Sequence, residues 1–364
     1  MSGSAVAGPA APADPRSEFD WNLPRGFPPP FVPAGNPITD AKVRLGRELF
    51  HEPKLSVTGK QSCSTCHRQE LAFTDGKPRA VGATGQLHPR SAMSLTNVAY
   101  NPSFTWADPS FDSLEAQVLQ PLFNQHPVEM GVAGHERQVT EALRTDSRYP
   151  GLFASAFPDS ADPVSIANIA RAIASFERTL ISGRSAFDRY VFDDDGSGMS
   201  AAARRGMALF YSERVGCAQC HSGINFSGPV RTARQPAVEA VYANTGLYNL
   251  DGHGAYPPDA AGIRDVTGNK KDEGHFRVPT LRNIALTAPY MHDGNIATLA
   301  EVIDHYSAGG RQIPLGPAAH NTLRDARVRP FQVTAEQKVD LVAFLESLTD
   351  AEFVANPRFH RDTR

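Results

Sequence analysis

Apolar residues recur at helical spacing in four segments of the chain, two in each half. The segments are 41–50, 165–181, 201–211 and 334–348. Thr39 or Asp40 is expected to cap the first segment, and Ser200 the third, because short polar side chains satisfy the free N–H groups of a first helical turn. A short and a long helix in each half predict a mainly α-helical protein built from two similar units.

The two short helices also share the pattern Arg-x-Gly-x-x-Leu-Phe. It is spelled by Arg44, Gly46, Leu49 and Phe50, and again by Arg204, Gly206, Leu209 and Phe210. Leu-Phe on an apolar helix face is usually plain core, so the pattern alone says little. Each copy, however, precedes its own Cys-x-x-Cys-His motif, which favours a duplicated domain.

The two motifs consume all four cysteines of the chain. They consist of Cys63, Cys66 and His67, and of Cys217, Cys220 and His221. This spacing is the attachment signature of c-type haem, in which two thioethers hold the porphyrin and the histidine binds iron. A zinc site would need further Cys ligands, and a redox dithiol would need neither the second copy nor the histidines. We therefore expect two covalently bound haem c groups.

Length and composition fit this interpretation. The chain has 364 residues, 41% of them hydrophobic, and a net charge of −3, which implies no bulk attraction to nucleic acid or to an anionic membrane. No apolar run approaches the roughly 18 residues of a membrane span. Haem c is attached outside the bacterial cytoplasm, so we expect a periplasmic protein. The start at Met1 shows no apolar signal core, so the export signal would have been removed or the native start would differ.

The expected domain plan is that of two cytochrome c-like units. It comprises an extended segment 1–37, a first haem domain 38–183, a linker 184–198 and a second haem domain 199–364. The first segment is rich in Pro, Gly and Ala, although Trp21 is expected to dock on the body. Asp193-Asp194-Asp195-Gly196 in the linker allows a calcium loop, but a solvated turn is favoured because later ligands of an EF-hand are missing.

Beyond residue 38 the chain resembles the bacterial dihaem cytochrome c peroxidase/MauG superfamily. The resemblance rests on the two haem motifs together with several further stretches. These are Pro89-Arg90, Trp106, Ser113–Gln117, Pro127–Met130, Phe276–Asn283 and Ala288–Gly294. It implies a peroxide-dependent oxidoreductase with two haem c groups and calcium.

For the first haem, the resemblance implies an open iron. The peroxidases of the family place a distal histidine where Ala83 stands here, and alanine cannot bind iron. His88, five residues further on, is the alternative ligand. The resemblance assigns acid–base work on peroxide to Glu129, with Gln117 and Pro121 shaping the site; a solvated glutamate is the alternative reading of Glu129.

For the second haem, the family places a methionine or tyrosine ligand at the position of Tyr306. The alternatives are a packed aromatic residue at 306, or His305 as ligand. Trp106 falls where the family has an aromatic relay between the haems, although a buried core tryptophan fits equally well. The expected calcium ligands are Ser91 and the carbonyl groups of Thr287 and Pro289, with Ser91 a weaker ligand than the family's asparagine.

Within the superfamily, the leader 19–29, Tyr306 and Ala83 are most similar to the MbnH branch of the MauG-like enzymes. That branch implies peroxide-driven oxidation of a tryptophan in a partner protein, to kynurenine, through a high-valent state shared by both haems. MauG itself has a surface tryptophan before its second motif where Val215 stands here, so the route to the partner would differ. The alternatives are a cytochrome c peroxidase supplied with electrons by a small redox protein, and a non-enzymatic electron-transfer cytochrome.

Overall fold

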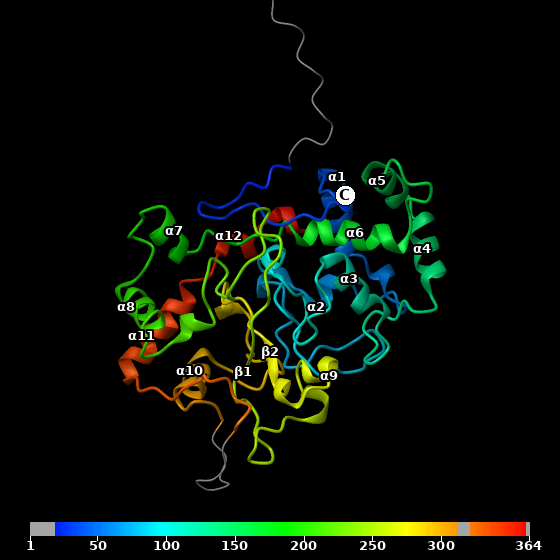
Figure 1. Ribbon diagram of the computed structural model, residues 1–364. Helices are drawn as coiled ribbons and strands as arrows, with labels where there is room; N and C mark the ends of the chain where they lie inside the picture. The colour runs from blue at the N-terminus through cyan, green and yellow to red at the C-terminus, as the bar shows by residue number, and fades with distance from the viewer. Residues whose placement is uncertain (1–18, 312–320, 362–364) are drawn as a thin grey trace, which may run out of the picture.

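The computed structural model describes residues 19–311 and 321–361, and it is mainly α-helical, as predicted. The helices are α1 (Asp40–Phe50), α2 (Cys63–Cys66), α3 (Leu114–Phe123), α4 (Glu136–Arg144), α5 (Tyr149–Ala156), α6 (Ile166–Glu177), α7 (Ala186–Phe192), α8 (Ala201–Phe210), α9 (Arg264–Thr267), α10 (Leu299–Ser307), α11 (Ala335–Glu346) and α12 (Ala351–Val354). Strands β1 (Tyr242–Asn244) and β2 (His275–Arg277) pair antiparallel, with Tyr242 opposite Arg277. Figure 1 shows α1 to α6 on one side of the molecule and α7, α8, α10 and α11 on the other. The part of the extended segment before residue 19 lies outside the described residues.

The four predicted helices begin where their capping residues stand. A side-chain oxygen accepts a hydrogen bond from the backbone N–H three residues further on in each case. The capping residues are Thr39, Ser165, Ser200 and Thr334. Of the two caps weighed for the first helix, Thr39 is the one observed, and Asp40 occupies the first helical turn, where its charge complements the helix dipole.

Each half is organised by two crossing helices, α1 with α6 and α8 with α11 (Figure 1). A glycine lies at each crossing. A Cβ atom on Gly46 would stand 1.9 Å from the Ala172 carbonyl oxygen, and one on Gly206 would stand 1.8 Å from that of Asp340. The shared Arg-x-Gly-x-x-Leu-Phe pattern therefore marks the place where two helix backbones touch, which explains its glycine physically.

The two halves have separate hydrophobic cores. The first contains Phe50 and Phe176, whose ring centroids lie 5.2 Å apart, and the second contains Phe210 and Phe344 at 5.0 Å. The C-terminal segment belongs to the second half of the chain, but its aromatic residues, including Phe353, pack into the first core. The last described residues thus complete the unit formed by the first half of the chain.

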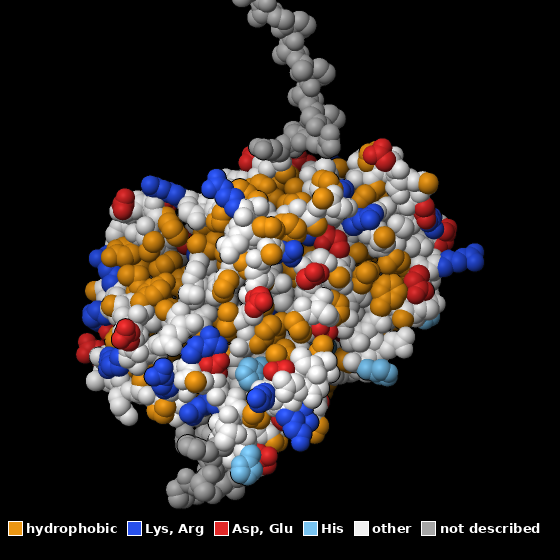
Figure 2. All heavy atoms as spheres, viewed as in Figure 1, with side chains coloured by type: hydrophobic (Ala, Val, Ile, Leu, Met, Phe, Trp, Pro, Cys, Tyr) orange, Lys and Arg blue, Asp and Glu red, His pale blue; other side chains and the backbone are white. Residues whose placement is uncertain are grey.

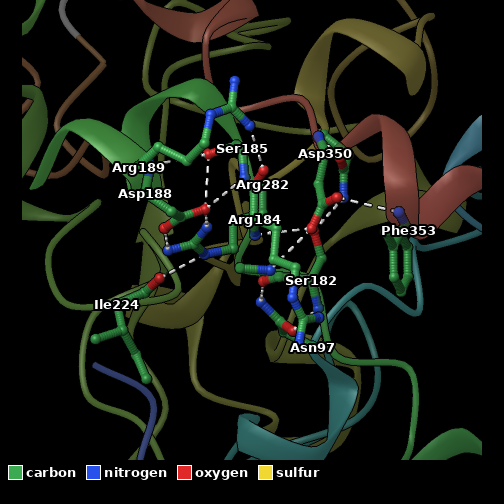
Figure 3. Close-up of polar contacts among 12 residues, drawn as sticks. Asn97, Ser182, Arg184, Ser185, Asp188, Arg189, Ile224, Arg282, Asp350 and Phe353 are labelled. Carbon is green, nitrogen blue, oxygen red and sulfur yellow. Dashed lines mark hydrogen bonds and ion pairs between the residues drawn. The ribbon is translucent and has the colours of Figure 1, made fainter. Parts of the chain in front are cut away.

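Buried polar groups join the halves (Figure 3). The Arg282 guanidinium, fully buried, donates to both carboxylate oxygens of Asp188 at 2.8 and 2.9 Å. Nearby, Asp350 Oδ2 accepts from the backbone N–H of Gly183 and Arg184, so the chain between the halves is held by the C-terminal segment. The segment predicted as a linker is therefore not a free tether, since it contains α7 and Asp188, the buried partner of Arg282.

The acidic run in that segment forms a local turn. Asp195 Oδ1 accepts from the N–H and the hydroxyl of Ser197, at 2.9 and 2.5 Å. Nowhere in the described ranges do three His, Cys, Asp or Glu side chains gather as a metal site would require. The turn interpretation of this run thus agrees with the structure better than the calcium loop.

On the face shown in Figure 2, charged side chains of both signs are scattered, and apolar side chains gather over α8 and α11. Tyr211 and Val339 are exposed in this region, at 49% and 64%. Among the helices the structure describes, none combines the length and apolar character needed to cross a bilayer.

Substitution at the crossing glycines tests the role assigned to them. Gly46→Ala and Gly206→Ala should each lower the free energy of unfolding by roughly 1–3 kcal/mol, because the new methyl group meets a backbone carbonyl. Gly151→Ala in α5 is the matched control, since a Cβ there meets nothing within 4 Å and should stabilise by roughly 0.5–1 kcal/mol. Chemical denaturation followed by circular dichroism measures all three. Equal behaviour of the three variants would contradict the crossing argument.

Candidate functional site

Both Cys-x-x-Cys-His motifs fold into a tight helical turn. The N–H of His67 donates to the Cys63 carbonyl at 2.9 Å, and that of His221 donates to the Cys217 carbonyl at 3.0 Å. This turn brings the two sulfur atoms of each motif to one side, with the histidine directly after them. All four thiols are free of disulfide bonds and half-buried, as attachment to haem requires.

The histidine rings of the two motifs are oriented in the same way. His67 Nδ1 donates to the Phe73 carbonyl and His221 Nδ1 donates to the Phe226 carbonyl, each at 2.8 Å. Because a carbonyl only accepts, the proton sits on Nδ1 and the Nε2 lone pair is left to bind a metal. Burial lowers the pKa of both imidazoles, which favours this neutral form.

The two carbonyl groups that fix these rings were missed in the sequence. Phe73 and Phe226 both have left-handed backbones, with φ of 61° and 50°, and this conformation turns their carbonyls toward the rings. The available signal was a phenylalanine six residues after His67 and five after His221.

A largely apolar cavity holds the second motif and Tyr306 together. Cys217, Cys220, His221 and Tyr306 all line it, with Leu345 and other apolar side chains of α10 and α11. Burial and the nearby sulfur atoms of Cys220 and Cys217 raise the pKa of Tyr306. Two thiols, an imidazole with a free Nε2 and an oxygen donor in an apolar cavity are the donor set that a haem c needs, so the residues fit this group.

His305, the rival of Tyr306, is engaged elsewhere. Its Nε2 atom lies 3.0 Å from the Thr245 carbonyl oxygen, to which it donates. His305 is also absent from the residues that line the cavity. The geometry thus favours Tyr306 over its neighbour.

Glu129 lies close enough to the first motif for its charge to act on one of the cysteines. Burial, and then the charges of Asp75 and Glu129, raise the pKa of Cys66 to about 11. The N–H of Ala83 donates to the Glu129 carbonyl at 2.6 Å, so the position where a distal histidine would stand is next to the acid–base candidate. Burial raises the pKa of the Glu129 carboxyl itself, and Asn124 partly opposes this rise.

The loop carrying Glu129 is fixed on α3, which also carries Gln117 and Pro121. The N–H of Met130 donates to the Pro121 carbonyl at 2.9 Å. Pro121 has no N–H to offer the carbonyl of Gln117 one turn earlier, which loosens the helix at this point. This hydrogen bond fixes the residue after Glu129 to Pro121, and Gln117 lies one turn away on the same helix.

His88 also lies beside Glu129. Its Nδ1 accepts from the Arg90 N–H at 3.1 Å, so in the neutral ring the proton sits on Nε2, which is 3.9 Å from Glu129 Oε1. Burial and then the Arg90 charge lower the pKa of His88 to about 4. The first site thus contains a neutral imidazole whose Nε2–H lies near the Glu129 carboxylate, and His88 as an iron ligand stays a prediction.

Trp106 reaches from the first half of the chain into the cavity of the second motif. Its indole N–H donates to the Ser91 carbonyl at 3.0 Å, and its own carbonyl accepts from the Arg277 N–H at 2.8 Å. Trp106 is half-buried, and one hydrogen bond holds its indole while the other holds its backbone. This position between the two halves is compatible with the relay role as well as with packing.

Ser91, Thr287 and Pro289, the expected calcium ligands, line the same cavity. Ser91 Oγ lies 3.4 Å from the carbonyl oxygens of Met291 and His292. This group offers neutral oxygen atoms only, which suit calcium in kind and predict weak binding.

His292 was not singled out in the sequence. It is 4% exposed, its Nε2 has no hydrogen-bond partner among the described residues, and its ring stacks on Phe276 at 3.7 Å. The sequence signal that could have identified it was its place in Ala288–Gly294, one of the stretches that carry the family resemblance. Val215, in contrast, is buried, so this position does not lead to the surface.

Comparison with known proteins places this geometry in a family. The family model described as di-haem cytochrome c peroxidase matches residues 40–196. The methylamine utilization protein MauG of Methylorubrum extorquens is 36% identical over 319 residues, which cover 87% of this chain and 80% of that protein. Cytochrome c551 peroxidase of Pseudomonas aeruginosa is 34% identical over 269 residues, 74% of this chain and 72% of that protein.

Solved structures agree. The crystal structure of a MauG-like protein associated with microbial copper homeostasis has a TM-score of 0.91 and 43% identity, over 95% of this chain and 100% of that chain. The diheme peroxidase BthA from Burkholderia thailandensis has the same fold, with a TM-score of 0.65 at 22% identity. The chain therefore belongs to the dihaem cytochrome c peroxidase and MauG family of oxidoreductases.

Proposed function

We propose that this dihaem enzyme uses hydrogen peroxide to oxidise a tryptophan of a partner protein to kynurenine. The observation that carries the proposal is the asymmetry of the two sites. Ala83 stands beside Glu129 at the first motif, whereas Tyr306 shares a cavity with the second motif. The first site thus has no ligating side chain at position 83, where the peroxidases of the family carry a distal histidine, and the second has an additional oxygen donor for its iron. Similarity to MauG of Methylorubrum extorquens supports a protein substrate.

The haems, when bound, supply the iron chemistry that takes oxidising equivalents from peroxide. Glu129 acts on the protons of that reaction. As a carboxylate it accepts a proton from one peroxide oxygen, and as a carboxylic acid it returns the proton to the other. Its carbonyl and the neighbouring Met130 N–H are tied to Ala83 and Pro121, so the side chain is held at the site.

Trp106 is the proposed relay between the two haems. Its indole N–H donates to the Ser91 carbonyl, which orients the ring, and its backbone carbonyl accepts from the Arg277 N–H. Tyr306 is the proposed sixth ligand of the second iron. A phenolate is a hard anionic donor, so it lowers the reduction potential relative to a thioether. We infer a periplasmic location, since attachment of haem c in bacteria takes place there, and weak calcium binding by Ser91, Thr287 and Pro289.

Spectroscopy of the holoprotein tests this function first. The ferric protein should give one high-spin and one low-spin haem signal by electron paramagnetic resonance, and one equivalent of peroxide should change both signals without added reductant. Kynurenine in a co-purified partner, detected by peptide mass spectrometry, completes the test. Two low-spin haems whose signals peroxide does not change would indicate an electron carrier. A reaction with peroxide only after reduction of the protein would indicate a conventional peroxidase.

Replacement of Glu129 tests its proton transfer. Glu129→Gln should slow peroxide turnover by about 10²–10⁴-fold, because the amide cannot exchange a proton. In the unmodified enzyme the carboxylate is the active form, so the rate should rise with pH through the Glu129 pKa, which burial places above the ordinary value of 4.5. This rise should vanish in the variant. Glu141→Gln on α4 is the control and should leave the pH profile unchanged; an unaltered rate in Glu129→Gln would exclude the role.

Replacement of Tyr306 tests the ligand of the second iron. Tyr306→Met should raise the reduction potential of the second haem by on the order of a few tenths of a volt, because a thioether favours ferrous iron. His305→Gln at the neighbouring position is the control, since an amide can still donate to the Thr245 carbonyl. The reduction potential of the second haem should not change in this variant. Potentiometric titration followed by absorbance measures both. A shift only in the His305 variant would reverse the assignment.

Calcium binding can be tested on Ser91. Calorimetric titration of calcium into chelator-treated holoprotein should give a Kd on the order of 10⁻⁴–10⁻³ M, as expected for a site with few charged ligands. Ser91→Asp should tighten binding by adding a carboxylate, and Ser91→Ala should weaken it. Ser110→Ala, at an exposed turn, is the control. Equal affinity in all four proteins would place calcium elsewhere.

A further inference from the structure

A buried carboxyl group with no assigned role lies beside the first haem motif. Glu177 is the last residue of α6 and is 5% exposed. Its Oε2 atom has no hydrogen-bond partner among the described residues. A carboxyl group removed from water without such a partner is unfavourable when ionised, so Glu177 needs either a proton or a neighbouring positive charge.

The internal repeat locates Glu177 relative to the haem. Phe176 packs against Gly46 in the same way as Phe344 packs against Gly206. A Cβ atom placed on either glycine would lie 2.9 Å from the Cβ atom of its phenylalanine. The residue after Phe344 is Leu345, which lines the cavity that holds the second motif. By the same helix crossing, Glu177 occupies the corresponding place at the first motif.

Electrostatics supports this placement independently. After burial, the charge of Glu177 is the largest influence that raises the pKa of the Cys63 thiol. Cys63 is one of the two attachment points of the first haem, whereas His67, the iron ligand, shows no such influence of Glu177. The side chains of Glu177 and Cys63 are therefore close enough for their charges to interact, which agrees with the place that the helix crossing gives to Glu177.

The charged groups around Glu177 do not neutralise it. Arg178 follows it at the end of α6, but the guanidinium is bound to both carboxylate oxygens of Glu115 of α3, at 2.8 and 2.7 Å. Asn36 donates to the same Glu115 carboxylate. Burial raises the pKa of Glu177 to about 8, with the Arg178 charge opposing this rise and the Glu115 charge adding to it.

We propose that Glu177 is a proton-binding site linked to the oxidation state of the first haem. The side chain holds a proton while this haem is ferrous and releases it to solvent when the haem becomes ferric. One electron leaves the iron to an external oxidant, and one proton leaves the carboxyl group, so the net charge of the haem and its neighbour stays constant. A buried carboxylate beside ferric haem stabilises the added positive charge. The second haem has Leu345 at the corresponding position and therefore lacks this proton-binding group.

The sign of the effect follows from this linkage. Between the two Glu177 pKa values, for ferrous and for ferric haem, reduction takes up a proton, so the reduction potential falls as pH rises. Below and above this pH window the carboxyl group keeps a single protonation state, so the reduction potential does not change with pH. The inference needs a haem at the first motif but not tryptophan oxidation, so its failure would leave the proposed function untouched.

Spectroelectrochemical titration of the holoprotein, from mildly acid to mildly alkaline solution, tests the proposal. The potential of the first haem should fall by up to about 59 mV per pH unit, the value for one proton per electron. Glu177→Gln, which keeps the shape of the side chain, and Glu177→Leu, which copies Leu345, should both abolish this slope. Redox-difference infrared spectra should show a protonated carboxyl band in the reduced state that both variants lack. Circular dichroism checks that each variant is folded.

Leu345→Glu is the reciprocal variant and should give the second haem a pH-dependent potential that it otherwise lacks. A slope at the first haem that persists in Glu177→Gln would overturn the proposal, because another group would then carry the proton. A level potential in the unmodified protein, with no carboxyl band in the infrared spectrum, would overturn it as well.

Discussion

The contact of two helix backbones at a glycine is the constraint on which each half of this protein depends. Gly46 and Gly206 allow a helix to touch the backbone of another at a distance that any side chain would prevent. This contact sets the positions of Phe176 and Phe344, and hence of the residues that follow them toward the haem motifs. Because both crossings share one geometry, a difference between the halves at a matched position, such as Glu177 against Leu345, can be interpreted chemically.

The two halves then act as one body because their junction is buried and polar. Asp350 of the C-terminal segment accepts from the N–H groups of Gly183 and Arg184. The buried pair of Arg282 and Asp188 fixes α7 beside them, and removing either partner would leave an unpaired buried charge. Trp106 belongs to the first half and yet lines the cavity of the second motif, where the Ser91 carbonyl and the Arg277 N–H hold it. A fixed distance between the two sites is what an enzyme needs if oxidising equivalents are to pass from one to the other, and a flexible tether would not provide it.

The sequence was informative wherever the determinant was local. The caps at Thr39 and Ser200, the crossing helices and the attachment motifs follow from neighbouring residues, and the structure agrees with them. The predicted roles of Glu129 and Tyr306 came from a family resemblance and await experiment. What the sequence concealed depends on long-range contact or on backbone conformation: the carbonyls of Phe73 and Phe226, the helix inside the expected linker, and the short strands β1 and β2. Glu177 looked like an ordinary polar end of a helix, because only the folded chain shows that it is buried.

The path of the C-terminal segment has a consequence for how the protein matures. Phe353 and Phe359 pack into the first core, and Arg361 donates to the Glu52 carboxylate of that same unit at 2.5 Å. The unit formed by the first half of the chain is thus completed by residues that are synthesised after the second attachment motif. During synthesis, the first attachment motif would therefore stay in an open, unfinished unit until the second half has been made, which leaves its cysteines accessible before the chain closes.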